Sequence, residues 1–108
     1  MMRQYFYLAL LALLLTACTA DNGKKYVIGV SQCSEDIWRD KLNSELVMST
    51  YQHDNVVLKF ASANDDDRLQ KQQIEQFIKE GVSLLIVSPN QIHTISSVID
   101  KAYDAGIP

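Results

Sequence analysis

YVIGVSQCSEDIWRD, residues 26–40, contains the transition from which the fold can be predicted: an apolar strand, a polar loop, and a helix opened by an aromatic and a guanidinium group. The nearly continuous apolar run at 26–30 is typical of a parallel strand that is covered on both faces. Ligands of open parallel sheets bind where such strands end. The loop from Ser31 to Asp36 is therefore the first candidate binding segment.

The same unit recurs along the chain at intervals of about 30 residues, the length of a βαβ unit. Val56 to Ala61 and Val82 to Val87 are predicted to be the second and third strands. An apolar helical stripe follows each strand: Trp38, Leu42 and Leu46; then Leu69, Ile74, Phe77 and Ile78; then Ile95, Val98, Ile99 and Ala102. The order β-α-β-α-β-α predicts an α/β fold with a parallel three-stranded sheet and helices on both faces.

Length and composition are those of one small globular domain. The chain has 108 residues, of which 47% are apolar and 21% charged, and its net charge of −3 gives no electrostatic basis for nucleic-acid binding. Only about 85 residues remain for a core once an export signal is discounted. Because residues 105–108 end a helix and point to a fourth strand, we expect residues 26–108 to be the N-terminal, incomplete part of a larger domain.

Residues 1–18 resemble a bacterial lipoprotein signal. Arg3 precedes an apolar run from Tyr5 to Leu15, and small residues then lead to Cys18. The resemblance implies cleavage before Cys18 and lipidation of its thiol, with residues 19–25 as a polar tether. The alternative is an uncleaved signal anchor, although the apolar run is shorter than the roughly 20 residues that span a bilayer. Either arrangement predicts an exported domain on the periplasmic side of a membrane.

Several common catalytic and cofactor motifs are missing from the sequence. The segment Ser31 to Asp40 lacks glycine, so neither a dinucleotide fingerprint nor a nucleotide-binding P-loop is present. There is no zinc, C-x-x-C or nucleophile-elbow motif, and Asp65, Asp66 and Asp67 lack the spacing of a calcium loop. We therefore predict a binding domain rather than an enzyme, with no cofactor and no metal.

Polar and aromatic residues instead gather where the three predicted strands end. Sugars present an apolar C–H face and a fringe of hydroxyls, so their binding needs a flat ring together with fixed donors and acceptors. The candidate ligand-binding residues are Ser34, Trp38, Arg39, Asn64, Asp65, Asn90 and Gln91.

Four of these candidates also have simple structural interpretations. Spacing alone slightly favours Trp38 as a packing residue at the head of a helical stripe. Arg39 is expected to pair with Asp36 or to lie in solvent. Asn64 and Asp65 are suited to cap the second helix, which does not exclude ligand binding.

Three longer stretches resemble the N-terminal lobe of type I periplasmic binding proteins of the ribose- and galactose-binding kind: IGVSQCSEDIWRDKLNSE, FASANDDDRLQKQQIEQFIKEGVSLLIVSPN and VIDKAYDAGIP. The resemblance implies two α/β lobes that close over a sugar, with Trp38 stacked on the ring and Arg39, Asn64 and Gln91 bonded to hydroxyls. Many relatives carry two aromatics in the first loop, whereas Ile37 precedes Trp38 here.

This resemblance gives two candidate functions. The first is an exported, lipid-anchored protein that binds a monosaccharide and delivers it to a membrane transporter permease. The second is the extracellular carbohydrate sensor of a hybrid histidine kinase, since the first loop is similar to those of furanose-type sugar binders and of such sensors in gut Bacteroidota. An exported hydrolase lacks a paired carboxylate or triad. A cytoplasmic repressor is disfavoured because a signal sequence stands in place of a helix-turn-helix.

Overall fold

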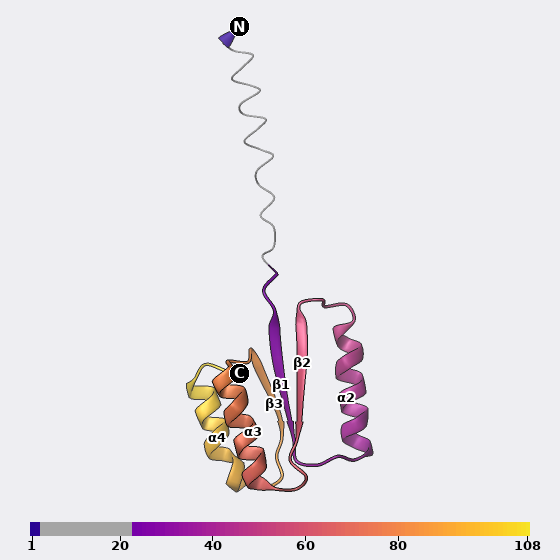
Figure 1. The fold of residues 1–108 in the computed structure, drawn as a ribbon, viewed down its shortest axis with the longest axis vertical. Helices are drawn as coiled ribbons and strands as arrows, with labels where there is room; N and C mark the ends of the chain where they lie inside the picture. Colours follow the sequence, from indigo (N-terminus) through magenta and orange to yellow (C-terminus); the bar gives the residue numbers. More distant parts are fainter. Residues whose placement is uncertain (3–22) are drawn as a thin grey trace.

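The computed structural model describes residues 1–2 and 23–108 of the chain, so the predicted signal segment, Cys18 and residues 19–22 of the tether lie outside the described residues. The elements in chain order are β1 (Tyr26–Gln32), α2 (Ile37–Thr50), β2 (Val56–Ser62), α3 (Asp67–Glu80), β3 (Leu84–Ser88) and α4 (Ile92–Asp104). This is the predicted β-α-β-α-β-α order (Figure 1).

The three strands form one parallel sheet in the order β2-β1-β3. β1 is central: Tyr26 pairs with Val56 of β2, and Ile28 pairs with Leu84 of β3. The predicted α/β class and parallel three-stranded sheet are therefore confirmed.

The helices cover opposite faces of the sheet. Neighbouring residues of β1 show this, because the side chain of Gln32 bonds to Asn43 of α2, whereas the side chain of Ser31 bonds to Gln70 of α3. α4 packs beside α3 on the same side (Figure 1). The chain thus leaves β1 toward one face and β3 toward the other, the arrangement that opens a crevice for ligands between two strand ends.

Strand boundaries differ from the prediction by one or two residues. β2 and β3 each end one residue later than predicted, at Ser62 and Ser88, and the two larger differences are at the end of β1 and the start of β3. β1 continues to Gln32, and both Ser31 and Gln32 are buried because their polar side chains are paired with helix residues. β3 begins at Leu84 rather than at Val82. Gly81 ends α3 in a left-handed conformation with φ of 67°, and the Val82 amide then bonds back to the carbonyl of Phe77, so Val82 belongs to the helix cap.

The core lies on the α3 and α4 face. Its two clusters are Phe77, Val82, Ala102 and Ile107, and Ile74, Ile95 and Val98. A Cβ built on Gly29 of β1 would lie 2.9 Å from Cγ of Phe77, so the glycine allows this ring to approach the sheet. On the other face, every residue of α2 is exposed or half-buried.

The C-terminal residues return to the sheet after α4. Ile107 is buried in the first core cluster, and the amide of Leu85 donates to the carbonyl of Pro108 over 2.9 Å. Pro108 therefore lies beside β3, on the side away from β1. Among residues 1–2 and 23–108, none of the helices has the length and hydropathy needed to cross a membrane.

Candidate functional site

The three loops that follow the strands meet at the carboxyl edge of the sheet, as the sequence predicts. Backbone hydrogen bonds join them directly: the Cys33 amide donates to the carbonyl of Ser88 over 3.0 Å, and the Asp65 amide donates to the carbonyl of Cys33 over 2.7 Å. Cys33, a buried residue, thus connects the loop after β1 to both of the others.

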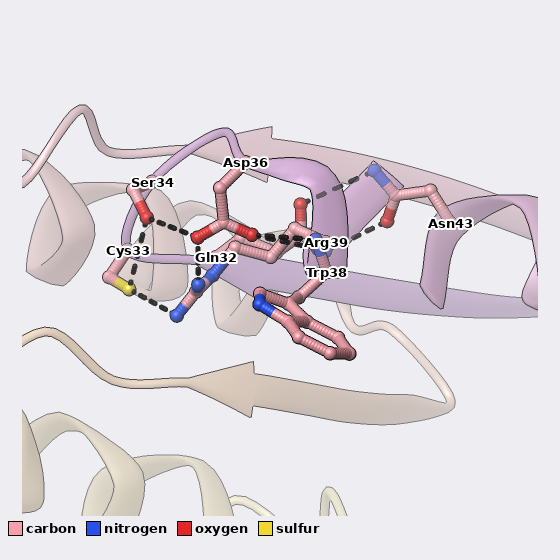
Figure 2. Close-up of polar contacts among 7 residues, drawn as sticks. All are labelled: Gln32, Cys33, Ser34, Asp36, Trp38, Arg39 and Asn43. Atoms are coloured by element: carbon pink, nitrogen blue, oxygen red, sulfur yellow. Dashed lines mark hydrogen bonds and ion pairs between the residues drawn. The ribbon is translucent and has the colours of Figure 1, made fainter. Parts of the chain in front are cut away.

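The first loop is organised by Asp36, the N-cap of α2 (Figure 2). Its carboxylate accepts hydrogen bonds from the backbone amides of Trp38 and Arg39, both over 3.0 Å. The bond from the Arg39 amide and the nearby guanidinium hold the pKa of Asp36 below its usual value. Asp36 therefore fixes the backbone that carries two of the predicted binding residues.

The guanidinium of Arg39 lies between two groups of the same loop. One Nη donates to the carboxylate of Asp36, and the other donates to the Cys33 sulfur over 3.0 Å. Ser34, which is half-buried, donates to Asp36 over 3.5 Å. The expected pairing of Arg39 with Asp36 is confirmed, and these contacts use only two of the five N–H donors of the guanidinium.

Trp38 lies in solvent, with 79% of its surface exposed. The packing interpretation favoured by its spacing is wrong. α2 turns its Arg39, Leu42 and Leu46 side toward the protein, and Trp38 is one position off this line. In Figure 2 only the backbone of Trp38 takes part in the polar contacts of the first loop.

The turn after β2 is left-handed at two residues. Asn64 has φ of 49° and Asp65 has φ of 60°, and both are exposed. The prediction that they cap α3 is wrong, because Asp66 is the N-cap and accepts from the amides of Arg68 and Leu69. The two preceding residues are thereby left with their side chains at the rim of the sheet.

The third loop contains Asn90 and Gln91. The side-chain amide of Asn90 donates to the Asp65 carbonyl over 3.0 Å and to the Asp67 carboxylate over 2.8 Å, so both of its donors are occupied. Gln91 is exposed at the N-cap position of α4. The structure therefore brings Asn64, Asp65 and Asn90 together on one side of the edge, across from Trp38 and Arg39.

Sequence reasoning missed the buried amides beneath this edge. Gln70 is fully buried and bonds to the end of β3, while Gln32 and Asn43 pair side chain to side chain over 2.8 Å. The signal for Gln70 was its position one turn before the buried Ile74, which places it on the inner face of α3. A glutamine at such a position is easily taken for a solvent-facing residue.

The chemical groups of this edge suit noncovalent recognition. An exposed indole ring, a guanidinium with spare donors, and exposed amide and carboxylate groups match the apolar face and hydroxyls of a polyol. Within the described residues 1–2 and 23–108, no group of three histidine, cysteine or acidic side chains could hold a metal ion.

Comparison with known proteins agrees with this geometry. Residues 28–108 match the family model described as a periplasmic binding protein domain. No curated protein is significantly similar to the chain.

The following three solved structures are each at least 30% identical to the chain. The fructose-binding periplasmic domain of a hybrid two-component system is 38% identical with a TM-score of 0.74, and the match covers 77% of this chain and 28% of that one. The binding protein of the arabinose ABC transporter from Shewanella, bound to L-arabinofuranose, is 32% identical with a TM-score of 0.62, covering 76% and 27%.

The third structure, from Mycobacterium smegmatis in complex with β-D-fucofuranose, is 30% identical with a TM-score of 0.62, and the match covers 77% of this chain and 27% of that one. The chain thus spans between a quarter and a third of the length of these structures. The match over residues 28–108 shows that the chain belongs to the periplasmic binding protein domain family, whose members bind ligands rather than catalyse reactions.

Proposed function

We propose that this chain is the N-terminal lobe of an exported protein that binds a monosaccharide between two α/β lobes and delivers it to a membrane transporter. The observation that carries the proposal is the exposed ring of Trp38 at the carboxyl edge of the sheet, next to the anchored guanidinium of Arg39. An aromatic ring held in solvent exposes apolar surface, which a sugar C–H face would cover. Differential affinity for the closed form would then drive closure of the lobes.

The first loop is preorganised for this role. Asp36 holds both the start of α2 and the guanidinium, so little side-chain freedom is lost when a ligand binds. Because Asp36 also balances the charge of Arg39, the pair suits the hydroxyls of an uncharged sugar. Asn64, Asp65 and Gln91 would supply further hydrogen bonds from the opposite side, and Ser34 and Asn90 would contribute mainly by holding the loops.

A furanose ring is the first ligand to test. Of the three solved relatives above, two hold furanose sugars and the third is described as fructose-binding. The same loop geometry could place the ring of Trp38 against such a small sugar. We propose a pentose or ketohexose of this size as the ligand.

Export and anchoring are further parts of the proposal. Residues 1–18 would act as a lipoprotein signal, with Cys18 lipidated and residues 19–25 as the tether of the domain that begins at Tyr26. Metabolic labelling with a fatty-acid analogue tests this directly: label that persists in Cys18→Ser would contradict it.

The second candidate function is a sugar sensor that belongs to a membrane histidine kinase. The 38% identity to the fructose-binding domain of a hybrid two-component system favours it. Reading the gene beyond Pro108 separates the two functions. A membrane helix followed by a kinase core would establish the sensor, whereas a second lobe followed by a stop codon would establish the transport protein.

Calorimetry on the full-length protein tests sugar binding. The panel contains D-fructose, L-arabinose, D-fucose, D-ribose and D-glucose, with maltose and D-glucuronate as controls. We expect one or more monosaccharides to bind, and Trp38→Ala to weaken that binding more than about tenfold. Tyr103→Ala is the matched control, since Tyr103 is an equally exposed aromatic residue in the last turn of α4, outside the three loops of the candidate site. No binding by the wild type, or equal affinity in Trp38→Ala, would contradict the proposal.

A further inference from the structure

Gln70 of α3 lies beneath the binding edge, where its side chain is fully buried. Its amide nitrogen donates to the carbonyl of Ser88 over 2.9 Å and to the hydroxyl of Ser31 over 3.2 Å. Its amide oxygen accepts from the backbone amide of Asn90 over 3.0 Å. One buried side chain thus joins the end of the central strand to the loop that follows β3.

Asn90 extends this connection to the loop after β2. Its backbone is held by Gln70, and its side chain donates to the Asp65 carbonyl and to the Asp67 carboxylate. Gln70 and Asn90 therefore form a continuous chain of hydrogen bonds from the interior to the rim. Each intermediate donor has a defined acceptor, so the position of Gln70 determines where Asn90 can place its amide.

The far end of this chain is a turn that needs external support. Asn64 and Asp65 both adopt left-handed backbone conformations, which cost free energy for every residue except glycine, although Asn and Asp tolerate them better than other residues do. Such conformations persist only where surrounding contacts hold them. The bonds from Asn90 to the Asp65 carbonyl and from the Asp65 amide to the Cys33 carbonyl supply those contacts.

We propose that Gln70 is a positioning residue for ligand binding, which acts through Asn90 to hold the Asn64–Asp65 turn in the orientation that presents its side chains to the ligand. This inference rests on the proposed function, because it assigns the geometry of that same site. Gln70 itself is buried below the rim and contacts no ligand. Its replacement changes affinity by letting the turn relax.

The test uses Gln70→Met in the full-length protein, with Gln73→Met as the matched control. Gln73 lies in the same helix, and its amide bonds to the Ser62 carbonyl at the end of β2, two residues before the turn, but it makes no bond to Asn90. Both variants lose an amide that holds a strand end. We expect Gln70→Met to weaken sugar binding by at least about tenfold in calorimetry, and Gln73→Met to weaken it less than about threefold.

Hydrogen exchange supplies a readout that a general loss of stability would not give. In Gln70→Met without ligand, peptides covering residues 62–68 and 88–92 should exchange faster, while peptides of α4 keep wild-type protection. Uniformly faster exchange, or equal affinity losses in Gln70→Met and Gln73→Met, would overturn the positioning role. Failure of the wild type to bind any sugar would instead overturn the proposed function, because it involves no change at Gln70.

A second pair of variants applies if Gln70→Met does not fold. Asp67→Ala removes one acceptor of the Asn90 amide at the surface, whereas Asp67→Asn keeps a side-chain oxygen at that position. We expect Asp67→Ala to weaken sugar binding and Asp67→Asn to restore most of the affinity. Wild-type affinity in Asp67→Ala would overturn the proposal.

Discussion

The two faces of the sheet are built differently. Toward α3 and α4 the sheet meets a packed apolar core in which Ile74 and Ile95 are fully buried. On the opposite face, no residue of α2 is fully buried, and polar contacts such as the Gln32–Asn43 pair join this helix to the sheet. The candidate site therefore has two walls. Trp38 and Arg39 form the wall on the α2 face, and Asn64, Asp65 and Asn90 form the wall on the α3 and α4 face.

Because of this difference, we expect the α3 and α4 face to contribute mainly to folding stability and the α2 face mainly to ligand binding. The wall formed by Asn64, Asp65 and Asn90 stands on a core that would resist displacement, with the buried Gln70 beneath it. The wall formed by Trp38 and Arg39 depends on the Asp36 cap and a few charged or polar bonds. Substitutions in the core should therefore unfold the protein, whereas those in the α2 wall should change binding with smaller effects on folding.

Ile74→Ala is expected to have the largest effect. Removal of this fully buried side chain should lower the free energy of unfolding by about 2–5 kcal/mol, because it leaves a cavity between α3 and α4. Leu46→Ala, in the half-buried stripe of α2, is the comparison and should cost about 1 kcal/mol. Urea denaturation measures both values. Equal decreases in the free energy of unfolding of the two variants would contradict the proposal that the two faces differ in their contribution to stability.

Gly29→Ala should destabilise the protein by about 1–3 kcal/mol. The added Cβ would lie 2.9 Å from the ring of Phe77, and the ring cannot move without disturbing the core. Gly23→Ala is the control, since an added Cβ there meets nothing within 4 Å. Thermal unfolding compares the two variants, and tolerance of alanine at Gly29 would show that α3 is less firmly seated than described.

The two helix caps provide a smaller and sharper test. Asp66→Ala removes only the cap of α3 and should cost about 1 kcal/mol. Asp36→Ala should lower the urea midpoint further, because it also frees Arg39 from its partner. It should weaken sugar binding as well, which Asp66→Ala should do less. A larger decrease of the urea midpoint in Asp66→Ala than in Asp36→Ala would mean that the α2 wall does not depend on Asp36.

Acid should produce the smallest effect. The pKa of Asp36 is lowered in the folded protein, so the unfolded chain takes up the proton first as pH falls. The resulting stabilisation is present above the ordinary pKa of 3.8 and is lost as pH drops through the folded-state value. Unfolding of wild type and Asp36→Asn is compared from about pH 7 to about pH 3. The variant, which keeps a capping oxygen, should lose less stability below about pH 4, and parallel curves would contradict this.

Sequence predicted the fold because the strands and the α3 and α4 stripes follow simple periodicity. The order of elements and the convergence of the three loops at one edge follow from parallel strands joined by helices. Strand ends were less predictable. Ser31 and Gln32 lie inside β1 because helix side chains pair with them, and one strand alone does not reveal such partners.

The sequence predicted which residue types gather at this edge of the sheet but not their individual conformations and contacts. The position of Trp38 depends on which side of α2 faces the sheet, and the weakly amphipathic sequence of this helix left that open. Asn64 and Asp65 have the composition of caps, yet their left-handed backbone comes from contacts with the other two loops. An Asn-Asp pair suits either a helix cap or a left-handed turn, so the local sequence did not decide between the two.

The departure of α2 and α3 toward opposite faces also affects how the site can evolve. Residues added to the loop after β1, beyond the bonded Cys33, would extend along the α2 face and would leave the core around Phe77 undisturbed. Insertions after β2 would instead interrupt the turn that is bonded to Cys33 and Asn90. Ligand preference should therefore be easier to alter by changes in the Trp38 loop than by changes in the opposite wall.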